Sequence, residues 1–178
     1  MPKLIILDRD GVINEDSDVY VKSAAEWHPL PGSAEAIARL NHQGYRAVVA
    51  TNQSGIGRGL FDTATLNLMH AKMHRIVGLA GGRIDAVFFC PHKNDDHCDC
   101  RKPKPGMYLE IARRFDRDLS SVPAVGDSLR DLVAASAVGC QPVLVKTGKG
   151  MRTLAAGGLP PGTLIFDDLA TVAAHYCP

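Results

Sequence analysis

Two aspartates separated by one residue follow the first apolar segment of the chain. Asp8 and Asp10 stand in the stretch LDRDGVIN, residues 7–14, directly after the apolar run of residues 4–7. Side chains two apart in a strand point the same way, so both carboxylates are expected to project from one strand end. Like charges so close cost free energy unless a cation or hydrogen bonds compensate. The pair therefore requires either a bound cation or hydrogen-bond donors beside it.

Further polar residues follow the later apolar segments. Parallel strands place their carboxyl ends at one edge of the sheet, so these groups are expected to converge there. Asp8, Asp10 and Asp127 are the three predicted carboxylates, and such oxygens suit Mg²⁺. The Lys102 ammonium and the Thr51 hydroxyl would bind an accompanying anion. The residues at the later strand ends are Thr51, Asn52, Gln53, Lys102, Asp127 and Asp131.

This set of groups indicates phosphoryl transfer. Mg²⁺ and a lysine neutralise phosphate charge, and a carboxylate attacks phosphorus to form an aspartyl-phosphate. An aspartate of ordinary pKa, about 3.9, is ionised at neutral pH and needs no base to act as the nucleophile. A second aspartate can protonate the leaving oxygen and then deprotonate the incoming water.

A second candidate site lies in a cysteine-rich segment. Cys90, His92, Cys98 and Cys100 offer three thiolates and an imidazole, the ligand set of a closed tetrahedral zinc site. Such a structural Zn²⁺ would hold the loop so that residues 101–102, directly after the last ligand, point into the active site. The alternative is a reduced cysteine cluster without metal. With five cysteines in all, an odd number, metal binding in a reducing compartment is favoured over disulfides.

Short apolar runs alternate with helical periodicity along the chain. This alternation predicts an α/β fold, a doubly wound Rossmann-like parallel sheet with helices on both faces. Helices are expected from Ser33, across residues 66–77, after Pro105 and after Asp127, and residues 155–162 are expected to be a surface loop. The predicted strands are residues 3–8, 45–51, 84–90, 122–127, 141–147 and 163–168.

The length and the net charge of the chain narrow the possible classes of protein. The 178 residues are expected to form one phosphatase domain, residues 1–178. A net charge of +1 without a long basic run argues against nucleic acid as a partner. No apolar stretch reaches the roughly 20 residues of a membrane span, and no signal peptide precedes the first strand. A cytoplasmic protein is expected.

Four motifs resemble those of the haloacid dehalogenase-like phosphatase superfamily: Asp8-x-Asp10, Thr51, Lys102, and Asp127 with Asp131. Within it, DRDGVIN, TNQSGIGRG, CPH…CDCRKPKPGM, VGD and LVKTGKG look like the D-glycero-D-manno-heptose 1,7-bisphosphate 7-phosphatases. The sequence departs from that family at Val12, where threonine is commoner, and in its short loop between His92 and Cys98.

The resemblance implies a role for each matching residue. Asp8 would be the nucleophile and Asp10 the general acid and base. Asp8, the backbone carbonyl of Asp10 and Asp127 would hold Mg²⁺, while Thr51 and Lys102 would grip the transferring phosphoryl group. Arg101 would select the substrate through its second phosphate. The other implied substrate contacts are Asp16, Tyr20, Asn52, Gln53 and Ser54.

The resemblance also implies a setting. The family has a minimal cap, so three loops would cover the site: one through Tyr20, one after Gln53, and the small zinc-bound loop. The substrate would be a small phosphorylated sugar in ADP-heptose and lipopolysaccharide core biosynthesis, and the enzyme a monomer. Two alternatives remain, a histidinol-phosphate phosphatase and, more remotely, a phospho-accepting receiver, which would not release phosphate.

Overall fold

The computed structural model describes residues 3–178 and has a six-stranded parallel sheet at its centre. The strands lie in the order β3-β2-β1-β4-β5-β6, so the direction of winding reverses between β1 and β4. This order confirms the predicted doubly wound fold, and such a reversal is where α/β proteins place their sites. The strands are β1 (Lys3–Leu7), β2 (Tyr45–Asn52), β3 (Ala86–Cys90), β4 (Pro123–Gly126), β5 (Gln141–Val145) and β6 (Leu164–Phe166).

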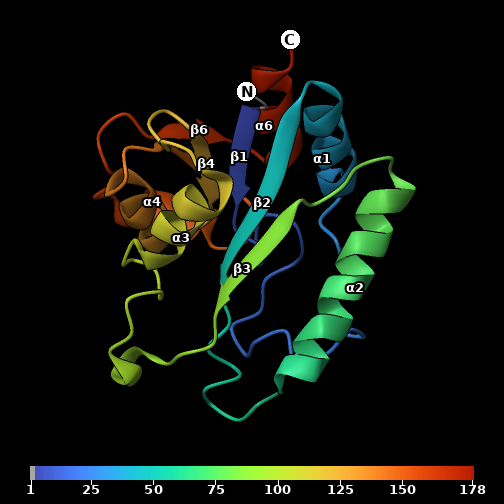
Figure 1. The fold of residues 1–178 in the computed structure, drawn as a ribbon, viewed down its shortest axis with the longest axis vertical. Helices are drawn as coiled ribbons and strands as arrows, with labels where there is room; N and C mark the ends of the chain where they lie inside the picture. Colours follow the sequence, from blue (N-terminus) through green and yellow to red (C-terminus); the bar gives the residue numbers. More distant parts are fainter. Residues whose placement is uncertain (1–2) are drawn as a thin grey trace.

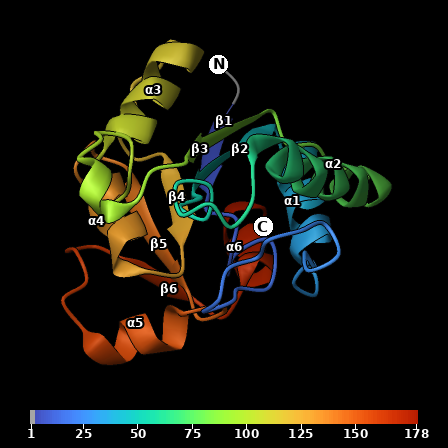
Figure 2. The same ribbon diagram turned by 90° about the horizontal axis from the view of Figure 1, so that it is seen from below.

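Helices cover both faces of the sheet, as Figures 1 and 2 show. Helices α1, α2 and α6 pack on one face, and α3 and α4 pack on the other. The α-helices are α1 (Ser33–His42), α2 (Thr63–Leu79), α3 (Gly106–Phe115), α4 (Leu129–Ser136), α5 (Gly150–Ala156) and α6 (Leu169–Tyr176); a short 3-10 helix, η1, spans Asn94–Asp96.

The central strands are apolar on both sides because each side meets a layer of helices. In β1, Ile5 and Leu7 join the core beneath α1, α2 and α6, whereas Leu4 and Ile6 join the core beneath α3 and α4. Each fully buried aliphatic side chain of this kind stabilises the fold by about 1.5–3 kcal/mol. The two cores hold the carboxyl ends of β1 and β4 side by side.

Two helices were not predicted. Helix α5 takes up Ala155 and Ala156, so the predicted surface loop over residues 155–162 begins after them. Helix α6 is capped by Asp168, whose carboxylate accepts a hydrogen bond from the Thr171 N–H at 2.8 Å. That capping pair is a recognisable helix start, but it directly follows the weakest predicted strand.

The connection from β1 to α1 runs over the carboxyl end of the sheet and is anchored by Trp27. The Trp27 side chain is completely buried in the core beneath α2. The Lys72 ammonium donates to the backbone carbonyls of Trp27 at 2.6 Å and Ala24 at 2.7 Å. This connection and the loops after β2 and β3 gather at the lower end in Figure 1, opposite both chain termini. No helix within residues 3–178 is both long and apolar enough to cross a membrane.

Candidate active site

A polar cavity of about 210 Å³ opens at the carboxyl ends of the central strands. Ten of the residues given a role in the active site from the sequence line it, so the topology brings these ten together. Thr51 is not among the lining residues, because its buried hydroxyl accepts a hydrogen bond from Gln53 Nε2 at 2.9 Å. The lining comprises Asp8, Asp10, Asp16, Ser17, Asp18, Tyr20, Val21, Asn52, Gln53, Ser54, Arg101, Lys102, Asp127, Arg130, Asp131 and Lys149.

The Lys102 ammonium lies at the floor of this cavity between two carboxylates. Its Nζ is 3.1 Å from Asp8 Oδ1 and 2.7 Å from Asp131 Oδ1, and it donates to the Ala50 carbonyl at 2.7 Å. Burial opposes the charge on Lys102, but the charges of Asp131 and Asp8 outweigh it and raise the pKa of Lys102 above its ordinary value. Lys102 is therefore a permanent cation.

Asn52 fixes the backbone from which Lys102 projects. Its side-chain amide donates to the Lys102 carbonyl at 3.0 Å and accepts from the Lys102 N–H at 3.1 Å. The paired hydrogen bonds join the end of β2 to the loop after β3. Asn52 thus lines the cavity as predicted and also holds Lys102 in place.

Three carboxylates converge beside Lys102, and one of them differs from the prediction. Oxygens of Asp8, Asp127 and Asp131 lie within 4.8 Å of one another. The carboxylates expected to converge were Asp8, Asp10 and Asp127; Asp131, named with Asp127 in the fourth motif, completes the cluster, and Asp10 lines the same cavity outside it. Asp131 Oδ2 accepts from the Ser128 N–H at 3.0 Å and from the Ser128 hydroxyl at 2.7 Å.

The crowding of these carboxylates shifts their pKa values. Burial, followed by the charge of Asp131, raises the pKa of Asp8 to about 6, so the ordinary pKa expected for Asp8 is wrong. Asp8 is nonetheless mostly ionised at neutral pH. Burial and the charges of Asp131 and Asp8 raise the pKa of Asp127 to about 8. One lysine leaves this group short of positive charge, so a hard divalent cation such as Mg²⁺ fits the donors present.

The Asp10 carboxylate lies outside this cluster of three carboxylates and is held by hydrogen bonds of its own. Its Oδ1 accepts from Arg9 Nε at 3.1 Å, Arg9 Nη2 at 2.8 Å and Asn14 Nδ2 at 2.8 Å, and its Oδ2 accepts from Gln53 Nε2 at 2.9 Å. Burial opposes ionisation, but Arg9 and these donors outweigh it and hold the pKa of Asp10 below its ordinary value. Because β1 ends at Leu7, strand alternation reaches neither Asp8 nor Asp10, and these donors set the direction of the Asp10 carboxylate.

Two glycines give the Asp127 carboxylate its space. A Cβ on Gly11 would stand 2.0 Å from Asp127 Oδ2, and one on Gly148 would stand 2.3 Å from the same atom. Gly11 also has a φ of +83°, which favours glycine. The Lys149 N–H donates to Asp127 Oδ2 at 2.8 Å, and the Lys149 ammonium lies 2.6 Å from Asp16 Oδ2. Lys149, which the sequence did not single out, therefore joins Asp127 to the loop after β1.

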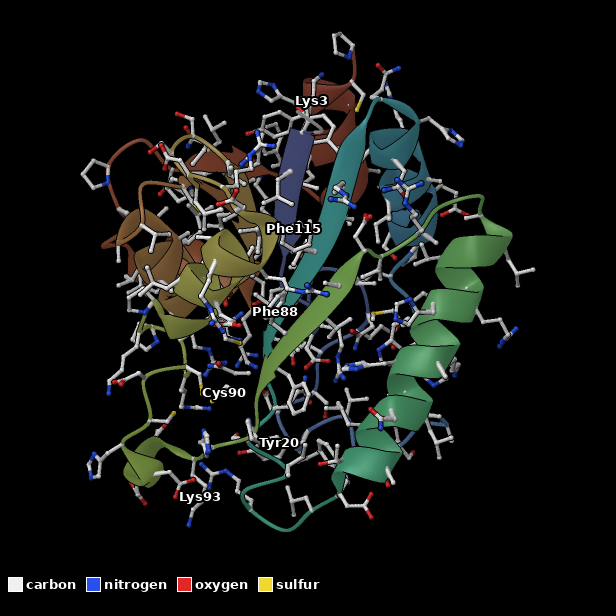
Figure 3. All side chains as sticks on the ribbon, in the orientation of Figure 1. Lys3, Tyr20, Phe88, Cys90, Lys93 and Phe115 are labelled. Carbon is white, nitrogen blue, oxygen red and sulfur yellow. The ribbon has the colours of Figure 1, made fainter. Side chains whose placement is uncertain are left out.

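The cysteine cluster is assembled as predicted. Cys90, His92, Cys98 and Cys100 have ligand atoms within 4.8 Å of one another, with individual separations from 3.1 to 3.6 Å. Zinc bonds of about 2.0–2.3 Å give tetrahedron edges of roughly 3.5–3.8 Å, so the set fits Zn²⁺. The contacting imidazole atom is Nδ1 of His92. Figure 3 labels Cys90 at the end of β3 and Lys93 in the loop beyond it, with Tyr20 at the same end of the molecule.

Two guanidinium groups stand between this cluster and the active site. Arg101 Nε donates to Asn94 Oδ1 at 2.6 Å and its Nη1 to the His92 carbonyl at 3.3 Å, so the cysteine-rich loop orients Arg101. Burial and the nearby charge of Arg130 lower the pKa of Arg101. Arg130 has no hydrogen-bond or ion-pair partner among residues 3–178. No motif or spacing in the sequence singles out Arg130, one residue before Asp131.

Two protein-family models match this chain. One, described as HAD-hydrolase-like, matches residues 99–172, and the other, described as Polynucleotide kinase 3 phosphatase, matches residues 3–131. The second match spans more than half of the chain and relates it to a phosphatase family, and the first relates its C-terminal part to HAD-like hydrolases.

Relatives along the full chain narrow the assignment. The D-glycero-beta-D-manno-heptose-1,7-bisphosphate 7-phosphatase of Bordetella bronchiseptica is 65% identical over 171 residues, 96% of each chain. The chain belongs to this phosphatase family. The family enzyme of Pseudomonas aeruginosa is 60% identical over 171 residues, again 96% of each chain. The family resemblance predicted from the motifs is thus confirmed.

A solved structure of a heptose-bisphosphate phosphatase has the same fold. The crystal structure of D,D-heptose 1,7-bisphosphate phosphatase from B. bronchiseptica, complexed with magnesium and phosphate, is 64% identical. It superposes with a TM-score of 0.97 and covers 98% of this chain and 97% of that one. That family member therefore binds both a divalent cation and phosphate.

We predict that the cysteine cluster holds one Zn²⁺ per chain and that its loss destabilises the fold, because binding energy at a structural site is folding energy. Cys98→Ser should abolish zinc in elemental analysis and lower Tm by several degrees, since each kcal/mol is worth about 2–4 °C at this size. The exposed neighbour His97, which lies outside the cluster, gives the control: His97→Asn should keep both zinc and Tm. A zinc-free wild-type protein prepared without chelators would contradict the prediction.

We also predict that Gly11→Ala disables the active site while Gly44→Ala does not. The two glycines have the same backbone, with φ of +83° and +84°, but a Cβ on Gly44 meets nothing within 4 Å. Each variant should lose about 1–3 kcal/mol of stability from the positive φ. Only Gly11→Ala should also displace the Asp127 carboxylate and weaken Mg²⁺ binding, measured by calorimetry. Equal Mg²⁺ affinity in the two variants would show that Asp127 does not need the space at Gly11.

Proposed function

We propose that this chain removes the 7-phosphate from D-glycero-β-D-manno-heptose 1,7-bisphosphate through an aspartyl-phosphate on Asp8. The observation that carries the mechanism is the buried Lys102, whose ammonium lies between Asp8 and Asp131 at the floor of the polar cavity. The full-length identity to heptose-bisphosphate phosphatases carries the substrate. The proposed mechanism and the proposed substrate together describe the hydrolysis of a sugar phosphate ester.

The residues that would hold Mg²⁺ are Asp8, Asp127 and the backbone carbonyl of Asp10. When bound, the cation supplies charge neutralisation for the phosphoryl oxygens. The fit rests on the three converging carboxylates and on the pKa values of Asp8 and Asp127, which crowding raises to about 6 and about 8. Asp131 is committed to Lys102 and Ser128, so it serves as the orienting partner of the lysine.

Asp8 would act as the nucleophile. One of its oxygens attacks phosphorus, and the bond between phosphorus and the sugar oxygen breaks. Asp10, which its donors keep ionised in the free enzyme, would take up a proton as the anionic substrate binds beside it and give that proton to the departing oxygen, which releases the heptose 1-phosphate. Asp10 then removes a proton from water, the water attacks the aspartyl-phosphate, and Asp8 is regenerated with release of inorganic phosphate. Lys102 and Thr51 would bind the transferring phosphoryl group throughout, Thr51 after its hydroxyl turns from Gln53.

Arg101 would recognise the phosphate that does not react, with Arg130 beside it. A guanidinium fork suits phosphate, and two neighbouring guanidiniums repel each other unless an anion lies between them. The remaining predicted contacts, Asp16, Tyr20 and residues 52–54, line the same cavity. This pair of cations also favours a bisphosphate over histidinol phosphate, whose second polar end is cationic.

The wider setting is part of the same proposal. The chain would act as a single phosphatase domain and as a monomer, which size-exclusion chromatography with light scattering would test. A reducing compartment such as the cytoplasm would suit five cysteines that form no disulfide. The product would feed nucleotide-heptose synthesis for lipopolysaccharide.

We predict that Asp8→Asn abolishes turnover with folding intact, because the amide keeps the shape but cannot attack phosphorus. Steady-state release of phosphate from the heptose bisphosphate measures the effect, and the wild-type Tm should be retained within a few degrees. Trapping experiments on the wild-type enzyme should give an acid-stable mass increase of one phosphoryl group on Asp8. Near-normal turnover in sequence-verified Asp8→Asn protein would exclude the covalent mechanism.

We predict different losses for the two neighbours Arg101 and Lys102. Arg101→Ala should lower kcat/KM for the bisphosphate by roughly 10–150-fold, the worth of a charge-assisted hydrogen bond of about 1.5–3 kcal/mol. The same variant should change little on 4-nitrophenyl phosphate, which has no second phosphate. Lys102→Met should lower kcat on both esters.

The exposed Arg113, which pairs with Glu110 on α3, supplies the control: Arg113→Ala should leave both esters unaffected. Equal losses on both esters in Arg101→Ala would place Arg101 with the reacting phosphoryl group instead. A bisphosphate that is hydrolysed no faster than histidinol phosphate by the wild type would reject the proposed substrate.

A further inference from the structure

We propose that Arg9 and His70 form a positioning pair that leaves a single oxygen of Asp10, Oδ2, available for proton transfer to the leaving group. The inference rests on the proposed function, because it concerns the general acid of that reaction. Neither residue lines the cavity, so both would act through Asp10.

The Arg9 side chain is unusual in both its burial and its geometry. It is completely buried although it lies between two aspartates of the active site. Its Nε and Nη2 both donate to the same oxygen, Asp10 Oδ1, whereas a guanidinium fork commonly spans both oxygens of a carboxylate. Asn14 Nδ2 adds a third donor to Oδ1 at 2.8 Å. With three donors, Oδ1 has no capacity left for substrate.

The other oxygen of Asp10 is in a different situation. Oδ2 accepts only from Gln53 Nε2 among residues 3–178, at 2.9 Å, and the same amide nitrogen also donates to Thr51 Oγ1. A carboxylate oxygen has two lone-pair positions, so Oδ2 keeps one free. Because Asp10 lines the cavity, the free position is the one from which a proton can reach a leaving oxygen.

His70 holds the guanidinium from the other side. It belongs to α2, is 8% exposed, and its Nε2 lies 3.3 Å from Arg9 Nη1. Burial, followed by the charge of Arg9, lowers the pKa of His70 to about 4, so the ring is neutral and Nε2 can accept from Arg9. Without that acceptor, Nη1 would be a buried donor without a partner, and the guanidinium would be free to turn.

A purely structural account explains these contacts less well. Buried ion pairs add little net stability compared with apolar side chains of similar size, because both charges lose their hydration. Here Arg9 and His70 fix the Asp10 carboxylate, which lines the reaction cavity. All three donors converge on Oδ1, and Oδ2 is left for the substrate. Such a geometry is expected where the contacts serve to orient the Asp10 carboxylate and not to stabilise the fold.

The test compares two esters in a single turnover with enzyme in excess, so that release of the leaving group reports the first step alone. The 7-oxygen of the heptose leaves as an alkoxide that needs a proton, whereas 4-nitrophenyl phosphate releases a phenolate that does not. Asp10→Asn should slow sugar release by about 10²–10⁴-fold, the usual contribution of a general acid, and slow phenolate release only slightly.

Arg9→Lys keeps the charge but cannot place two donors on Oδ1, so it should reproduce this selective loss, by about tenfold or more on the sugar ester. His70→Phe should do the same, whereas His70→Gln, which keeps an acceptor, should stay near the wild type. The controls are His74→Phe, an exposed histidine one turn further along α2, and Arg46→Lys, a surface residue paired with Asp85. Neither control should alter either ester.

The outcomes separate the possibilities. Equal losses on both esters in Arg9→Lys or His70→Phe, or no loss on the sugar ester, would overturn the positioning role. If Arg9→Lys does not fold, as its Tm would show, the comparison of His70→Phe with His70→Gln decides by itself. A wild-type protein that releases no sugar, or an Asp10→Asn variant without the selective loss, would instead reject the proposed function.

Discussion

The buried ion pairs of Lys102 are the interaction on which the rest of the site depends. Placing three carboxylates within 4.8 Å of one another is unfavourable unless positive charge lies among them. Lys102 provides one charge from inside the protein, and a divalent cation would provide the remainder. The surrounding structure serves this arrangement: Asn52 holds the lysine backbone, Ser128 holds Asp131, and Gly11 leaves room for Asp127.

The topology of the sheet explains why residues far apart in the chain can surround the positive charge of Lys102. β1 and β4 are neighbours in space although two strands, three α-helices and the 3-10 helix η1 separate them in sequence. Their ends therefore bring Asp8 and Asp127 together, and the loop after β3 brings Lys102. The cysteine cluster contributes a second constraint, because it fixes the loop that ends in Arg101 and Lys102.

Much of this arrangement could be predicted from the sequence, for reasons that also show the limit. Six apolar runs identified the strands, and the polar residues at their ends identified the cavity, because parallel strands end at a common edge. Strand periodicity could not show which carboxylates cluster, because β1 ends at Leu7: Asp131 joins Asp8 and Asp127, and Asp10 lines the cavity beside them. Arg9 and His70 could not be paired from sequence, since 61 residues separate them and only the packing of α2 against the β1 loop brings them together.

The anchoring of the β1–α1 connection has a consequence for how such enzymes diversify. The segment is anchored near its C-terminal end by Trp27 in the core and by Lys72, while residues 16–20, most of which line the cavity, lie outside both cores. Changes in those residues therefore alter the wall that a substrate meets without disturbing the packing that holds Asp8. Selection for a new phosphate ester can act on this wall independently of the chemistry, so substrate range can evolve at little cost in folding.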